Sequence, residues 1–169
     1  SDGAQEERVL AALSRAYMHN LDLFRAKQTL EYQAALFPKG QYVGEMWLLR
    51  GQVEEISKRP DRAISAYAEA AKLLKEDIQR AQVLLRIGRL ESARGASGSA
   101  ASVLGRAVSL FNRVESEEVI PDHLDALFEM GDSFYRLRNW RQAAKAYDLA
   151  NKKSSKRDER RSMAAFRIG

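Results

Sequence analysis

The chain has 169 residues, of which 45% are hydrophobic and 30% are charged, a balance typical of a folded globular protein with its own core. It contains only 10 glycines and 3 prolines, too few for an all-β protein with many tight turns or for a collagen-like chain. The lack of cysteine excludes a disulfide scaffold, a thiolate zinc site and a cysteine nucleophile.

The net charge of +5 is concentrated in one short segment. Residues 152–161 contain six basic and two acidic residues, whereas residues 1–151 contain 21 of each kind. The excess therefore does not indicate a basic face along the whole molecule. No run of about 18 apolar residues is present, so we expect no helix that spans a membrane.

Apolar residues recur at helical spacing along most of the chain, and no strand pattern stands out. The spacing predicts helices over residues 4–19, 22–37, 41–57, 61–74, 77–94, 97–113, 121–138, 140–153 and 157–169. We expect Pro121 in the first turn of its helix, with Ile120 extended before it. The predicted fold class is all-α.

A short motif repeats in phase with these helices. Each copy is closed by a small residue, and these are Ser14, Gly51, Gly88, Gly131 and Gly169, at spacings of 37, 37, 43 and 38. Twelve residues after the first four comes an alanine, and four residues further on comes a large apolar residue, which is Leu30, Tyr67, Leu104 and Tyr147 in turn. Glycine inside a helix costs about 1 kcal/mol relative to alanine, so we expect the paired helix to approach it closely.

This pattern resembles the tetratricopeptide repeat (TPR) family, whose unit runs Trp-x-x-Leu-Gly-x-x-Tyr, then Ala-x-x-x-Phe, then Pro. The departures are Arg50 in place of the first leucine of the second unit, and Glu54 and Glu91 in place of aromatic residues. The resemblance implies a right-handed α-solenoid of antiparallel helix pairs over residues 1–169. We place the repeats at about 6–40, 43–76, 80–115 and 123–156, with the first helix of a fifth at 157–169. Because the fifth unit is incomplete, we expect the chain to be part of a longer repeat protein.

No set of residues forms a nucleophile, a base and a group that orients them, so we predict a protein that is not an enzyme and needs no cofactor or metal. His19 and His123 are both expected to be solvated or to cap a helix.

The resemblance implies a concave groove, lined by the first helix of each repeat, that holds a peptide or helix of a partner. Carried over by position, the groove residues are Arg15, Leu48, Gln52, Glu55, Leu85, Arg86, Arg89, Phe128, Glu129, Asp132, Tyr135 and Arg136. They give a surface of mixed charge, with the apolar members as anchors. The subgroup that clamps a terminal carboxylate is rejected, because only Arg15 and Arg86 fall at its basic positions and both its asparagines are missing.

A protein partner is therefore the leading hypothesis. The alternative is a segment of a bacterial exopolysaccharide export or envelope assembly protein, in which Phe128, Asp132 and Tyr135 would contact the sugar. The basic segment 152–161 is interpreted chiefly as a connection between repeats, with docking of an acidic protein or lipid as a second possibility. Nucleic acid is the least favoured partner, since no aromatic platform accompanies these charges. The compartment stays open, with bacterial periplasm or cytoplasm preferred.

Overall fold

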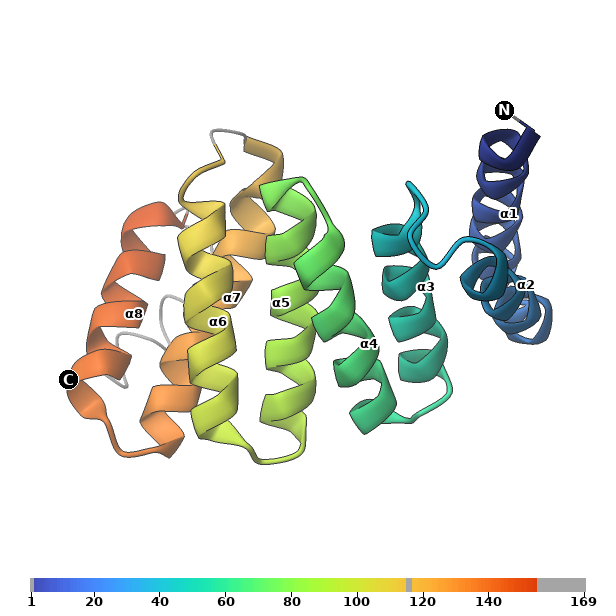
Figure 1. Cartoon of the computed structure of the whole chain (residues 1–169). Coiled ribbons are helices and arrows are strands. Elements are labelled where there is room, and N and C mark those ends of the chain that lie inside the picture. Colours follow the sequence, from blue (N-terminus) through green and yellow to red (C-terminus); the bar gives the residue numbers. More distant parts are fainter. Residues whose placement is uncertain (1, 115–116, 155–169) are drawn as a thin grey trace. The chain divides into compact units, whose positions relative to one another are not determined.

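The computed structural model describes residues 2–114 and 117–154, which form helices joined by turns (Figure 1). The α-helices are α1 (Asp2–His19), α2 (Leu23–Leu36), α3 (Val43–Ile56), α4 (Pro60–Leu73), α5 (Asp77–Ala93), α6 (Ser97–Phe111), α7 (Ile120–Arg136) and α8 (Trp140–Lys153). A short 3-10 helix, η1 (Glu117–Val119), leads into α7, and these described ranges contain no strand. The predicted all-α helical repeat fold is confirmed.

The eight predicted helices within the described ranges are confirmed, with ends that agree to within two residues. The ninth, at 157–169, lies outside the described residues. The expectation that Ile120 is extended was wrong: η1 runs directly into α7, so Ile120 is the first residue of that helix. Pro121 still lies in the first turn, where its missing N–H leaves no hydrogen bond unmade.

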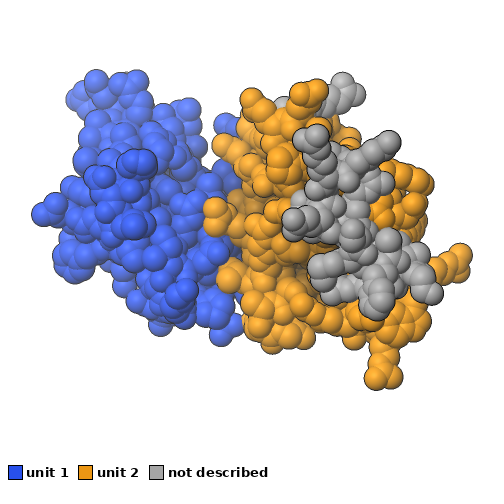
Figure 2. Space-filling model, turned by 180° about the vertical axis from the view of Figure 1, so that it is seen from behind, with its two compact units in different colours: residues 1–75 blue, residues 76–169 orange. Residues whose placement is uncertain are grey.

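The chain divides into two compact units, residues 1–75 and 76–169 (Figure 2). Unit 1 contains α1–α4 and unit 2 contains α5–α8. Within unit 2, α6 packs on both α5 and α7, and α7 packs on α8. Within unit 1, α3 packs on α1, α2 and α4, around a core that includes Met18, Leu30, Met46 and Leu49.

In the second, third and fourth repeats, a glycine on the first helix packs against a large side chain on the second. The ring of Tyr147 is 1% exposed and covers Gly131, where an added Cβ would lie 2.5 Å from the ring. Tyr67 covers Gly51 in the same way, and Leu104 covers Gly88. The mid-helix glycines therefore allow the close approach that the sequence predicts.

The two buried tyrosines also reach back to their first helices. The Tyr147 hydroxyl donates to Asp132 Oδ1 at 2.5 Å, and the Tyr67 hydroxyl donates to Glu55 Oε2 at 2.5 Å. A buried phenol needs a hydrogen-bond partner, and each carboxylate supplies one at the edge of the core.

The four described first helices, α1, α3, α5 and α7, end in the same left-handed turn. The residues with positive φ are Leu21 (56°), Lys58 (58°), Gly95 (82°) and Arg138 (57°), each seven positions after the small residue of its repeat. In the third repeat, the Ala96 N–H bonds to the Glu91 carbonyl at 2.9 Å and the Gly95 N–H bonds to the Ser92 carbonyl at 3.1 Å. The other three turns repeat both bonds, which together are the Schellman pattern of a helix C-terminus.

The acidic departures from the repeat motif are explained by these turns. Glu54 and Glu91 are buried three residues after their glycines. The Glu91 carboxylate accepts from Arg94 Nε at 2.6 Å, and Glu54 lies 3.2 Å from Arg59 Nη1. An ion pair to a turn arginine thus occupies the place of the usual aromatic side chain.

His123 is buried, so the expectation of a solvated or capping side chain was wrong. It is 2% exposed and stacks on Phe111, with ring centroids 5.6 Å apart. Burial, aided by the nearby charge of Lys153, lowers the pKa of His123 to about 4. The ring is therefore neutral at pH 7 and forms part of the core between α6 and α7.

We predict that Gly131→Ala destabilises the protein by about 1–3 kcal/mol, because its methyl group would overlap the buried Tyr147 ring. Gly105→Ala, also inside a helix of unit 2, is the control, since an added Cβ there meets only Met130 Sδ at 3.7 Å. We expect that variant to be neutral or slightly stabilised. Urea unfolding followed by circular dichroism measures both, and equal stabilities would contradict the proposed packing.

Gly95→Ala should destabilise by about 1 kcal/mol through backbone strain alone, because φ is 82° and no atom lies within 4 Å of an added Cβ. Gly98→Ala has equally open surroundings but lies in α6, so it should be neutral or stabilising. The difference between their unfolding free energies isolates the cost of the left-handed turn. A Gly95→Ala variant as stable as Gly98→Ala would disprove that cost.

Stability should fall as the pH is lowered from about 6.5 to about 4. The unfolded chain takes up a proton on His123 near its ordinary pKa of 6.5, whereas the folded chain does so only near 4. This difference lowers the free energy of unfolding by about 3 kcal/mol once both forms are protonated. His123→Phe should remove this part of the pH dependence, and the exposed His19→Gln should leave it unchanged. Urea titrations across this pH range provide the measurement, and identical profiles for wild type and His123→Phe would refute the assignment.

Candidate binding face on the first helices

The twelve predicted groove residues lie on the first helices of the repeats, on α1 and α3 in unit 1 and on α5 and α7 in unit 2. We call the side of these helices that carries them the first-helix face and describe it separately for each unit.

In unit 1, an ion pair joins the first helices of two successive repeats. Arg15 Nη1 lies 2.6 Å from Glu45 Oε1, and the two side chains are 48% and 26% exposed. Leu48 and Gln52 are half-buried on α3. Glu55 is half-buried and accepts the Tyr67 hydrogen bond, so this predicted groove residue also supports the helix pair.

In unit 2, polar contacts join α5 to α7 along their length. Arg89 is central, with Nη2 2.5 Å from Asp125 Oδ2 and Nε 2.7 Å from Glu129 Oε1. On one side of it Gln82 Nε2 donates to Asp122 at 2.8 Å. On the other side Arg136 Nη1 donates to Ser92 Oγ at 2.6 Å.

The arginine pairs of the two units occupy equivalent positions. Arg15 and Arg89 each directly follow the small residue of their repeat. Glu45 and Asp125 each stand six positions before the small residue of the next repeat. The sequence analysis named the two arginines but did not predict their ion pairs with Glu45 and Asp125. The opposite charges at equivalent positions of successive repeats could have indicated these pairs.

Burial shifts the pKa values of the charged side chains around Arg89. It raises the pKa of Glu129, and the neighbouring Asp125 and Asp132 act in the same direction, while Arg89 partly offsets the effect. Burial also acts to lower the pKa of Arg89, but its bonds to the two carboxylates outweigh this and raise it overall. One guanidinium thus stands among three carboxylates on a half-buried surface.

The apolar anchors predicted for unit 2 differ in accessibility. Leu85 and Phe128 are 2% and 6% exposed and belong to the core, whereas Tyr135 is 37% exposed and packs edge-on against Trp140. Arg86 and Arg136 are exposed, and Asp132 accepts the Tyr147 hydroxyl. The accessible part of the face is therefore mainly charged.

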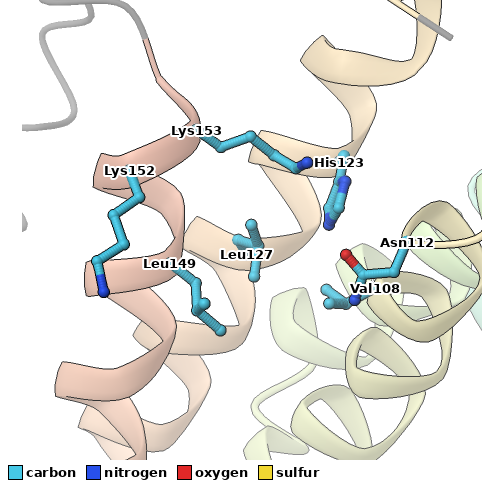
Figure 3. Close-up of a pocket in the computed structure, with 7 residues that line it drawn as sticks. All are labelled: Val108, Asn112, His123, Leu127, Leu149, Lys152 and Lys153. Carbon is cyan, nitrogen blue, oxygen red and sulfur yellow. The ribbon is translucent and has the colours of Figure 1, made fainter. Parts of the chain in front are cut away.

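A separate cavity of about 300 Å³ lies among α6, α7 and α8 of unit 2 (Figure 3). Its walls are Val108, Asn112, His123, Leu127, Leu149, Lys152 and Lys153. The Lys153 side chain extends toward the His123 ring (Figure 3). Sequence reasoning did not predict this cavity, because its walls come from three helices with no shared motif.

Neither a metal site nor a membrane span emerges from the structure as described. Within residues 2–114 and 117–154, no group of three or more His, Asp or Glu side chains is placed to hold a metal ion. No described helix is both long and apolar enough to cross a bilayer.

Comparison with solved structures identifies the architecture. BtubC (BKLC) from P. vanneervenii has a TM-score of 0.73 and 14% identity, over 87% of this chain and 62% of that one. A putative kinesin light chain with nearly identical TPR-like repeats, from Podosopora anserina, has a TM-score of 0.67 and 15% identity, over 98% and 84% of the two chains. The P58(IPK) TPR domain has a TM-score of 0.55 and 18% identity, over 97% of this chain and 45% of that one.

No protein-family model matches the sequence, and no curated protein matches it. The likeness is thus one of structure. The chain has the TPR-like helical repeat fold.

Proposed function

We propose that the chain is a non-enzymatic scaffold that binds a segment of a partner protein on its first-helix face. TPR-like folds commonly mediate protein–protein interactions, and stacked helical repeats present extended surfaces suited to them. The observation that carries the proposal is the cluster of Arg89, Asp125, Glu129 and Asp132, which lies half-exposed across α5 and α7.

The cluster favours a partner segment with a basic side chain. It holds three carboxylates and one guanidinium, so its formal charge is negative. The pKa of Glu129 is raised because the cost of burying its negative charge exceeds the stabilisation that Arg89 provides. A lysine or arginine of the partner seated beside Glu129 would compensate this carboxylate and displace water from it.

The surroundings also support a protein over the alternative, an exopolysaccharide. That alternative needs aromatic residues open to the sugar, but Phe128 is only 6% exposed and Asp132 already binds Tyr147. Tyr135 is then the one accessible aromatic member of the set proposed to contact the sugar. The charged side chains around Arg89 offer a protein segment several directional contacts instead.

The proposal predicts that peptides selected from a random displayed library carry Lys or Arg and bind through α5 and α7. Glu129→Gln should weaken their binding by about tenfold or more, because it removes the charge that the basic side chain faces. Asp148→Asn is the matched control, since it removes one carboxylate from α8, where Asp148 is 56% exposed and pairs with Lys152. Isothermal calorimetry measures the affinities, and amide chemical shifts locate the bound peptide.

Three results would count against the proposal. Selected peptides could lack basic residues, Glu129→Gln could bind as well as wild type, or the shifted amides could lie outside α5 and α7. Titration with acidic and neutral oligosaccharides in the same NMR experiment tests the alternative partner. Shifts on α7 with a sugar but with no peptide would replace the protein partner by a glycan.

A further inference from the structure

Half of the twelve exposed large apolar side chains in the described chain lie in or beside three of the turns that join a first helix to a second one. Such side chains in the described chain include Leu21, Phe24, Ile56, Tyr135, Leu137 and Trp140, which lie in these turns or in the helical turn beside them. Phe24 is 72% exposed and Leu21 is 68% exposed. These are among the most exposed apolar side chains of the structure, so packing does not account for them.

The turn between α7 and α8 combines this feature with positive charge. Leu137 and Trp140 are 48% and 55% exposed, and Arg138 and Arg141 beside them are also exposed. We call these four residues the turn patch. Between Asp132 and Asp148 the sequence has four basic residues and no acidic one. Among the described residues, no carboxylate forms an ion pair with either arginine of the patch.

Unit 1 has exposed apolar side chains at both of its turns and basic ones beside them at the turn between α3 and α4. Leu21 and Phe24 project from the turn between α1 and α2, and Ile56 lies beside Lys58 and the exposed Arg62 at the turn between α3 and α4. Both turns lie at the same end of unit 1 (Figure 1). The combination of exposed apolar and basic side chains therefore occurs at two of the four described turns, whereas the turn between α1 and α2 contains Asp22, which pairs with Arg25.

The combination of apolar and basic side chains in the patch is suited to a lipid bilayer with anionic headgroups. The apolar side chains of the patch are exposed on a turn between two helices, with basic side chains directly beside them. The interfacial region of a lipid bilayer takes up Trp and Leu side chains from such a turn, and Trp prefers this depth. Arginines around them then meet phosphate and carboxylate headgroups, and each basic residue adds to the attraction of an anionic leaflet.

We propose that the turn patch docks the protein peripherally on an anionic lipid surface. Leu137 and Trp140 enter the interface, while Arg138 and Arg141 bind the headgroups. This surface differs from the cluster around Glu129 on the first-helix face, so each of the two proposals can be tested independently of the other. Single-stranded nucleic acid and acidic proteins are the competing partners, and the experiment separates them.

The test uses the whole chain with Trp47→Phe, which leaves Trp140 as the sole tryptophan. Vesicles of phosphatidylcholine with about a third phosphatidylserine are compared with pure phosphatidylcholine vesicles at low salt. We expect cosedimentation with the anionic vesicles, a blue shift of the Trp140 emission and protection of Trp140 from an aqueous quencher. Binding should weaken steeply as salt is added.

Two variants locate the contact. Arg138→Glu/Arg141→Glu should reduce partition into anionic vesicles by about tenfold or more, because it reverses two charges at the patch. Leu137→Ser should reduce both partition and the blue shift. Arg106→Glu, on an exposed position of α6, is a control that reverses one charge outside the patch, and it should retain most of the binding. Circular dichroism confirms that each variant remains folded.

The proposal is overturned if anionic vesicles do not bind, or if neutral vesicles bind equally well. It is also overturned if the double arginine variant binds as Arg106→Glu does, because the charge of residues 152–161 would then carry the effect. Binding of a poly(dT) oligonucleotide or of polyglutamate, with no blue shift on vesicles, would assign the patch to one of the competing partners.

Discussion

The close approach of first and second helices at Gly51, Gly88 and Gly131 is the constraint on which the rest of the structure depends. Gly131 can contact the Tyr147 ring only because it has no Cβ, and the same small-against-large contact recurs at Gly51 and Gly88. The contact fixes how far apart the helices lie and how they are rotated about their axes. That rotation decides which side chains of the first helix turn toward the core and which remain outside.

The polar groups of the first-helix face follow from this rotation. Tyr67 and Tyr147 fill the space over a glycine, and their hydroxyls reach Glu55 and Asp132 at the border of the face. Arg89, one residue after Gly88, then points toward α7 and meets Asp125 and Glu129. The half-buried charges of the candidate site are thus positioned by the apolar packing beneath them, and any change in that packing would move them together.

The sequence predicted the helices and their pairing well, because the repeated small and large residues report directly on packing. It could not separate buried from exposed members of the groove: Leu85 and Phe128 share a helical face with charged residues, and only the rotation of α5 and α7 places them in the core. His123 was misjudged for a similar reason, since its partner Phe111 comes from α6. The left-handed turns were readable only at Gly95, because Leu21, Lys58 and Arg138 adopt a conformation that their residue types disfavour.

Two of those three turns carry side chains that packing does not explain. Glycine would adopt positive φ with less strain, and Gly95 shows that the turn accommodates it. Leu21 and Arg138 carry side chains that are exposed and take no part in the core, so their strain is not offset by burial. Leu21 and Arg138 help to close their helices through backbone hydrogen bonds, while their exposed side chains remain available for a contact outside the fold. In unit 2 that contact would lie at the end of the helix pair, leaving the charged surface across α5 and α7 open to a different partner.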